Sequence, residues 1–289
     1  MKTTLQFKII LFFITTIHFY SCTSVPEKIK TAPDKRGILF IIGGGERDDT
    51  LMQQMVDLSG WKKGETIAII PLTSEYDDSA YMWTNDQLQK LTGQAAINID
   101  SASINNQIRI DSLSKAKIIF ICGGDQNRFM RLTINTGIIE AIKTAYNNGA
   151  TVGGTSAGAS LMSEMMITGN QLLDTAYKAT FDKIRSANVE LKPGIGLLDS
   201  IIIDQHFITR SRFNRMLSAI MDHPNYQCIG IDESTALIVQ GDSATVVGVS
   251  EVVVFSNPKN IHNSDHNLIG ADEIDIAIHL PGDKFKIKN

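Results

Sequence analysis

Short, continuously apolar runs, each followed by a longer amphipathic segment, recur along the chain from Gly37 onward. Strands that are apolar on both faces are typical of parallel sheets that helices cover on both sides, because a half-solvated strand would alternate instead. The pattern predicts an α/β protein with an open, mostly parallel sheet and helices on both faces. The predicted strands are 37–45, 65–74, 95–100, 115–126 and 150–156, and the predicted helices are 50–60, 79–93, 127–149 and 157–166.

The part of the chain beyond residue 200 is richer in strands. Apolar runs predict strands within 200–207, 228–240, 244–255 and 274–280. We expect them to continue the sheet and to end it in extra antiparallel strands. No change in composition marks a second domain, so a single domain is expected over 37–289.

The N-terminus has the features of an export signal. Lys2 and Lys8 precede an apolar run that is short for a membrane span, and Ser21 and Cys22 follow it. A small residue before a cysteine is typical of lipoprotein processing, so residues 1–22 are expected to be a signal peptide that ends at a lipidated Cys22. Residues 23–36 are then a tether, and the mature protein is membrane-anchored on the periplasmic or cell-surface side. The alternative is an ordinary signal peptide with a coincidental cysteine.

Composition excludes several function classes. The formal net charge of the 289 residues is −4, and no basic stripe carries interleaved aromatic residues, so nucleic acid is not an expected partner. The cysteines have no metal-site spacing, and Cys122 and Cys228 lie in apolar runs where small buried residues are common. Neither a metal nor an organic cofactor is expected.

Glycine-rich turns follow three of the predicted strands, at 41–46, 121–126 and 153–158. None of them matches a dinucleotide or P-loop pattern. The third contains GTSAG at 154–158, which fits the G-x-S-x-G elbow, in which a tight strand-to-helix turn presents a serine as nucleophile. Ser156 is therefore the candidate nucleophile, and the amide of Ala157 is the candidate donor to an oxyanion.

A serine nucleophile needs a base and a carboxylate that orients it. His206 ends the apolar run of SIIIDQHF, where a parallel strand would bring it to the same sheet edge. Asp174, Asp204 and the pair Asp232 and Glu233 are candidates for the carboxylate. Glu233 is preferred because it follows a predicted strand directly, and Asp174 comes second.

Three arginines follow the candidate base in FITRSRFNRM: Arg210, Arg212 and Arg215. They lie where the first turns of a helix are expected, although cations there oppose the helix dipole. We interpret them as a clamp that binds substrate carboxylates in bidentate geometry. A solvated basic surface is the alternative.

GGDQ, GGTSAGAS, DQHFITRSRFNRM and GIDESTALIV together resemble cyanophycinase, a serine peptidase related to the aspartyl dipeptidases, over roughly residues 37–255. The resemblance implies a fold similar to class I glutamine amidotransferases and flavodoxin, and hydrolysis of cyanophycin-like aspartyl-arginine peptides to β-Asp-Arg dipeptides. It also implies roles for residues that match these motifs. The implied catalytic residues are Ser156, His206 and Glu233, the implied substrate-binding residues are Gln126, Asp204, Gln205, Arg210, Arg212 and Arg215, and the inferred oxyanion donors are Ala157 and the Gly124–Asp125 turn.

Two alternatives to cyanophycin hydrolysis remain open. One is an aspartyl dipeptidase that does not act on polymer, and the other is a surface lipoprotein that binds peptides without cleaving them. The leader would place the protein outside the cell, and the segment 170–194 has no clear family pattern. A homodimer is also left open.

Overall fold

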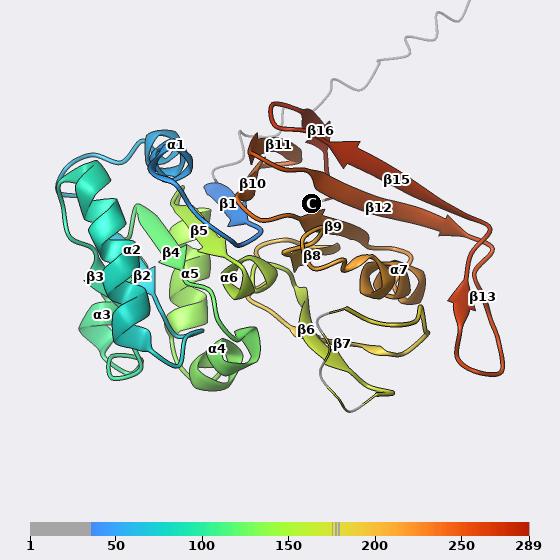
Figure 1. Cartoon of the computed structure of the whole chain (residues 1–289). Helices are drawn as coiled ribbons and strands as arrows, with labels where there is room; N and C mark the ends of the chain where they lie inside the picture. The colour runs from blue at the N-terminus through green and yellow to red at the C-terminus, as the bar shows by residue number, and fades with distance from the viewer. Residues whose placement is uncertain (1–35, 175, 177, 179, 289) are drawn as a thin grey trace, which may run out of the picture. The chain divides into compact units, whose positions relative to one another are not determined.

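The computed structural model is built around an eight-stranded sheet, whose strands are β1 Ile38–Ile42, β2 Ile67–Ile70, β3 Ile97–Asn98, β4 Ile118–Ile121, β5 Thr151–Thr155, β10 Thr235–Gln240, β11 Ser243–Gly248 and β16 Lys284–Lys286 (Figure 1). Their order is β16-β11-β10-β1-β5-β4-β2-β3. The strands from β1 to β3 in this order are parallel, and the other three are antiparallel. The predicted α/β class with a mostly parallel sheet is confirmed. The structure describes residues 36–174, 176, 178 and 180–288, so Cys22 and the predicted signal lie outside it.

A second sheet has the order β15-β12-β9-β8, with β8 Ile201–Gln205, β9 Gln227–Ile231, β12 Val252–Lys259 and β15 Glu273–His279. The expectation that all later strands continue the first sheet is therefore wrong, because only β10, β11 and β16 do so. β8 and β9 are parallel and buried along their whole length. These two strands can lie in a separate sheet because side chains cover both of their faces. Two small sheets pair β6 Met165–Gln171 with β7 Val189–Pro193 and β13 His262–Asn263 with β14 Ile269–Gly270.

Helices cover the faces of the sheets. The helices of the described residues are α1 Asp49–Ser59, α2 Asp77–Thr92, α3 Gln107–Leu113, α4 Gln126–Thr133, α5 Ile138–Asn147, α6 Ala157–Ser160 and α7 Phe213–Asp222. Side chains of α1 and α2 pack on one face of the main sheet, and those of α5 pack on the other. α7 packs on the outer face of the second sheet. Among the described residues, no helix has both the length and the apolar character that crossing a membrane would require.

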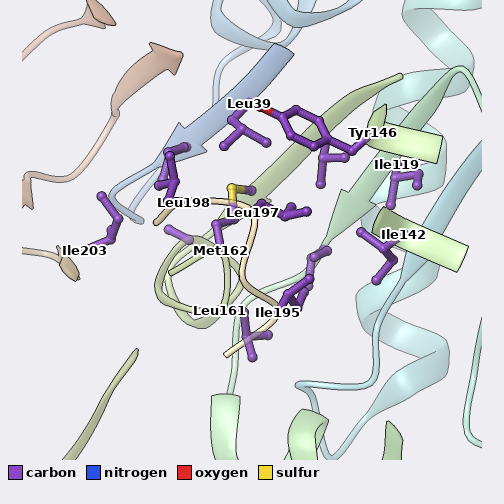
Figure 2. Close-up of a cluster of buried hydrophobic side chains, with 14 of the residues drawn as sticks. Leu39, Ile119, Ile142, Tyr146, Leu161, Met162, Ile195, Leu197, Leu198 and Ile203 are labelled. Carbon is purple, nitrogen blue, oxygen red and sulfur yellow. The ribbon is translucent and has the colours of Figure 1, made fainter. Parts of the chain in front are cut away.

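One buried cluster joins the two sheets. Leu39 of β1 and Ile203 of β8 belong to it, together with Ile142 of α5 and residues of the loop 195–198 (Figure 2). Each Å² of apolar surface that this cluster buries stabilises the folded state by about 25 cal/mol. The cluster therefore holds β8 close to β1, although about 160 residues separate the two strands. The strand that ends at the candidate base is thus packed against the sheet that carries the candidate nucleophile.

Three predicted helix boundaries are wrong. The first helix, predicted to start at Thr50, begins at Asp49 and is capped by Asp48, whose Oδ1 accepts a hydrogen bond from the amide of Leu51 at 2.7 Å. The predicted helix 127–149 is two helices, because the chain breaks between Ile134 and Gly137.

The third error is the helix predicted over 157–166, which ends at Ser160. The carbonyls of Leu161 and Met162 accept hydrogen bonds from Ile195 and Leu197. The backbone groups that would have continued the helix are thus paired with a distant loop, and β6 begins at Met165.

Candidate active site

Ser156 lies at the turn between β5 and α6, in a strained backbone conformation. Its φ of 54° and ψ of −114° lie outside the regions that non-glycine residues normally occupy. The glycines of the motif allow this turn to pack tightly: a Cβ at Gly158 would lie 2.4 Å from the carbonyl oxygen of Ile121 in β4. The predicted elbow is therefore present, with the serine at the carboxyl edge of the parallel sheet.

The structure brings Ser156, His206 and Glu233 together in one chain of hydrogen bonds. The distance from Ser156 Oγ to His206 Nε2 is 2.9 Å, and that from His206 Nδ1 to Glu233 Oε1 is 2.5 Å. In the tautomer that these contacts favour, Nδ1–H donates to the carboxylate and Nε2 accepts from the serine hydroxyl. This arrangement can remove the hydroxyl proton as the oxygen attacks a carbonyl carbon.

The last residue of β1 and the two glycines after it hold the backbone of the site in place. The amide of Ser156 donates to the carbonyl of Ile42 at 3.1 Å. The amide of His206 donates to the carbonyl of Gly43 at 2.7 Å, and that of Ser234 donates to Gly44 at 2.8 Å. Successive carbonyls of one short segment thus position the nucleophile, the base and the residue that follows Glu233.

The glycines of this segment are needed for close approach to side chains rather than to a ligand. A Cβ at Gly44 would lie 2.2 Å from Cε1 of His206, and one at Gly45 would lie 2.7 Å from Cβ of Glu233. Both glycines have positive φ. The sequence pattern identified this segment as one of three glycine-rich turns after strands, and it did not identify it as the support of the imidazole.

Burial and neighbouring cations lower the pKa of His206. Desolvation is the largest cause, Arg210 and Arg212 add to it, and the hydrogen bond to Glu233 opposes it. The imidazole of His206 therefore remains neutral at pH values low enough to protonate an exposed histidine. A neutral ring can act as a general base.

A pocket of about 460 Å³ opens beside Ser156, and its lining carries five cationic side chains and one acidic side chain. The acidic residue is Asp125, and the cationic residues are Arg131, Lys192, Arg210, Arg212 and Arg215. Gln126 and Gln205 also line it, so five of the six predicted substrate-binding residues reach the pocket. This excess of positive charge favours ligands that carry carboxylates.

Asp204 is the predicted binding residue that does not line the pocket. It is fully buried, and its carboxylate accepts hydrogen bonds from Nε and Nη2 of Arg215 and lies 3.4 Å from Nη1 of Arg212. A carboxylate that is already shared between two arginines cannot receive a substrate guanidinium. Asp204 therefore lies behind the arginines and not in the pocket, where the resemblance implied it, and it compensates their buried charge.

A model of Peptidase family S51 matches residues 39–247. The chain belongs to peptidase family S51. Among curated S51 relatives, a cyanophycinase of Geminocystis herdmanii (strain PCC 6308) is 33% identical, and the alignment covers 84% of this chain and 89% of the relative. A Peptidase E of Actinobacillus pleuropneumoniae serotype 5b (strain L20) is 26% identical, with 67% and 80% covered.

Solved structures show the same fold. A peptidase from an acI-B1 Actinobacterium superposes with a TM-score of 0.63 at 19% identity, covering 88% of this chain and 98% of its own. A putative Peptidase E from Listeria monocytogenes EGD-e has a TM-score of 0.51 at 19% identity, covering 74% and 100%. The S51 assignment makes this chain a serine-type peptidase, whose substrate is a peptide.

One of the predicted oxyanion donors is already paired within the protein. The amide of Ala157, the first residue of α6, has no acceptor among the described residues and lies next to the nucleophile. The amide of Asp125 donates to the carbonyl of Thr73 at 2.8 Å, so it is not available to a substrate. Gly124, with φ of 143°, is left as the second candidate donor in that turn.

The other candidate acids lie in other interactions of the S51 fold. Asp174 is exposed and pairs with Arg185 at 3.1 Å. Asp232 accepts hydrogen bonds from the amides of Ile208 and Thr209, which fixes the turn after His206. Glu233 is the candidate that contacts the imidazole.

Several lining residues of the pocket were not predicted. Thr168, Gly169 and Asn170 come from β6, and Lys192 comes from β7. Asn170 and Lys192 lie in the segment 170–194, for which the sequence had no clear pattern, and Thr168 and Gly169 directly precede it. No sequence signal marks them. Arg131 lies on the helix that begins at Gln126, so the GGDQ turn was a signal that could have indicated it.

Proposed function

We propose that this S51 peptidase is an exopeptidase that hydrolyses cyanophycin-like aspartyl-arginine peptides to β-Asp-Arg through an acyl-enzyme on Ser156. The observation that carries the proposal is a complete serine–histidine–glutamate relay beside a cationic pocket. Curated relatives named cyanophycinase, at 26% to 33% identity, support the substrate class.

The substrate carboxylates are bound by the arginines in this proposal. Arg215 is oriented by Asp204, and its third nitrogen, Nη1, is buried without an acceptor among the described residues. A buried donor that lacks a partner costs about 1–3 kcal/mol, so a ligand carboxylate at this point would gain that energy on binding. The amide oxygen of Gln126 is available as an acceptor, because its Nε2 donates to the carbonyl of Ile167.

Catalysis then proceeds in two halves. His206 Nε2 takes the proton of Ser156 Oγ while the oxygen attacks the carbonyl carbon, and the amides of Ala157 and Gly124 stabilise the oxyanion. The intermediate collapses to an acyl-enzyme as His206 returns the proton to the departing amine. A water molecule then attacks the ester, with the same imidazole as base, and releases the acid and the free serine.

The test is to incubate the purified protein with cyanophycin and to quantify β-Asp-Arg by mass spectrometry. We expect release by the parent and none by Ser156→Ala, which should still bind polymer. Turnover of short aspartyl dipeptides without polymer would favour the dipeptidase alternative, which the Peptidase E relatives support. Binding without turnover by the parent would favour the non-catalytic lipoprotein, and equal rates for parent and Ser156→Ala would show that the elbow is wrongly assigned.

We also propose that the chain is exported and anchored through Cys22, on the basis of Lys2, Lys8 and the apolar run that precedes the cysteine. Metabolic labelling with palmitate should modify the parent and not Cys22→Ser. Equal labelling of both would overturn this proposal.

A further inference from the structure

A second pocket, of about 370 Å³, opens next to the nucleophile. The lining passes from Gly124 and Ser156 in the cationic pocket to Gly123 and Thr155 in this one. A Cβ at Gly123 would lie 3.3 Å from Cβ of Ser156, so a lining residue of the second pocket is next to the reacting serine. We call it the aromatic groove; its further lining residues are Arg47, Ser74, Tyr76, Ser79, Ala80, Trp83, Thr84 and Cys122.

One wall of the aromatic groove is formed by α2 and its N-cap. Tyr76, Ser79, Ala80 and Trp83 occupy positions i, i+3, i+4 and i+7, which lie on one face of a helix. Tyr76 and Trp83 are 76% and 75% exposed, and small side chains separate them. Large aromatic side chains in this pattern are normally buried, so two exposed rings with a gap between them form a surface on which a flat group can pack.

The lining of the aromatic groove also carries a cation. Arg47 lies over the ring of Phe120, with its guanidinium carbon 5.0 Å from the ring centroid. Its Nη1 is buried and has no acceptor among the described residues. An anionic group of a ligand would supply the missing acceptor.

The outer end of the aromatic groove is acidic. Tyr76 and Ser79 also border a depression that contains Glu75 and Asp78. Both acids are exposed, and neither forms an ion pair with another described residue. The groove therefore combines a cation and aromatic rings with negative charge on the side where Tyr76 and Ser79 also border the depression.

We propose that the aromatic groove is the subsite for the arginyl unit on the far side of the scissile bond from the cationic pocket. The α-carboxylate of this unit pairs with Arg47, and its guanidinium packs on Trp83 and Tyr76 with Glu75 and Asp78 beyond. The identity of the bound unit as arginine rests on the proposed function, whereas the groove and its charges are features of the structure. The groove would then determine which residue the enzyme accepts as leaving group.

Occupancy of the groove can be measured without turnover. Trp61 and Trp83 are the two tryptophans of the chain, so Trp61→Phe with Ser156→Ala leaves Trp83 as the sole reporter in an inactive protein. We expect its fluorescence to change in a saturable manner with the two-unit peptide (β-Asp-Arg)₂, and to change little when alanine replaces the second arginine. No change with (β-Asp-Arg)₂, under conditions where calorimetry detects binding, would overturn the proposal.

Kinetics of the active protein give a second test. Trp83→Ala should raise KM for (β-Asp-Arg)₂ about tenfold, the order expected for loss of a cation–π contact. It should leave kcat/KM for the alanine-containing peptide unchanged. Met82→Ala is the matched control, because Met82 is exposed on the same helix and does not line the groove.

Equal effects of Trp83→Ala on both peptides, or an equal effect of Met82→Ala, would contradict the subsite. Arg47→Gln should weaken binding of (β-Asp-Arg)₂ and not of the analogue whose second arginine is an argininamide, which lacks that α-carboxylate. Failure of the proposed function is read separately, from the cyanophycin assay, because the fluorescence titration needs no cleavage.

Discussion

The substitution Gly44→Ala should uncouple the base from the nucleophile while leaving the substrate pocket unchanged. The added Cβ would lie 2.2 Å from Cε1, 2.5 Å from Nε2 and 2.7 Å from Nδ1 of His206. Carbon atoms in contact are about 3.5–4.0 Å apart, so the ring must move by more than about 1 Å. Such a shift breaks at least one of the hydrogen bonds to Ser156 and Glu233, which are 2.9 and 2.5 Å long.

The size of the effect follows from this displacement. Misplacing a catalytic group by about 1 Å costs about 100-fold in rate, which is about 2.7 kcal/mol of transition-state stabilisation. We expect kcat to fall by that factor with KM nearly unchanged, because Gly44 does not line the cationic pocket. Alanine at a φ of 117° also costs about 1–3 kcal/mol of folding stability.

The assay is steady-state hydrolysis of (β-Asp-Arg)₂, with thermal unfolding measured on the same samples. Gly64→Ala is the matched control, because Gly64 has a φ of 100° and nothing within 4 Å of an added Cβ. It should lose stability and keep its rate. If Gly44→Ala keeps the parental kcat, or if Gly64→Ala loses rate equally, the argument that this glycine positions the imidazole is refuted.

Three further predictions concern the same site. Glu233→Gln should lower kcat by about 10³-fold or more, because the imidazole loses the partner that fixes its tautomer. Asp174→Asn should leave kcat unchanged. If steady-state kinetics showed the larger loss for Asp174→Asn, the acid would be Asp174. Asp204→Asn should lower the free energy of unfolding by about 3–5 kcal/mol, because Arg215 and Arg212 lose their buried counter-charge; urea unfolding measures this, and a loss no larger than that of the exposed Asp174→Asn would contradict it. The acid limb of kcat/KM should lie below pH 6.5, the ordinary pKa of histidine, because burial lowers the pKa of His206. Activity falls on this limb because protonation of His206 removes the base. A limb above pH 6.5 in the pH–rate profile would show that another group titrates.

Much of the fold could be predicted because its cause is local. Continuously apolar strands need cover on both faces wherever they occur, and the pattern of runs and amphipathic segments repeats that requirement along the chain. The elbow at Ser156 is likewise a local feature, since a tight strand-to-helix turn needs glycines on both sides of the serine. The site residues that were predicted lie next to such strand ends.

What could not be predicted depends on contacts between distant segments. Ser160 and not Met166 ends α6, because the loop 195–198 pairs with the next carbonyls. Asp204 follows a strand as a binding residue would, yet its two arginine partners place it in the core rather than in the pocket.

The sequence by itself determined that this chain would form a parallel sheet and would present a serine, a histidine and an acid at strand ends, because burial and turn geometry depend on neighbouring residues. Only the tertiary structure decided that His206 would come from a second sheet, that Glu233 rather than Asp174 would reach it, and that Gly44 would support the ring. Those outcomes depend on how two sheets pack around a shared core, and packing is a property of surfaces that meet only after the chain has folded.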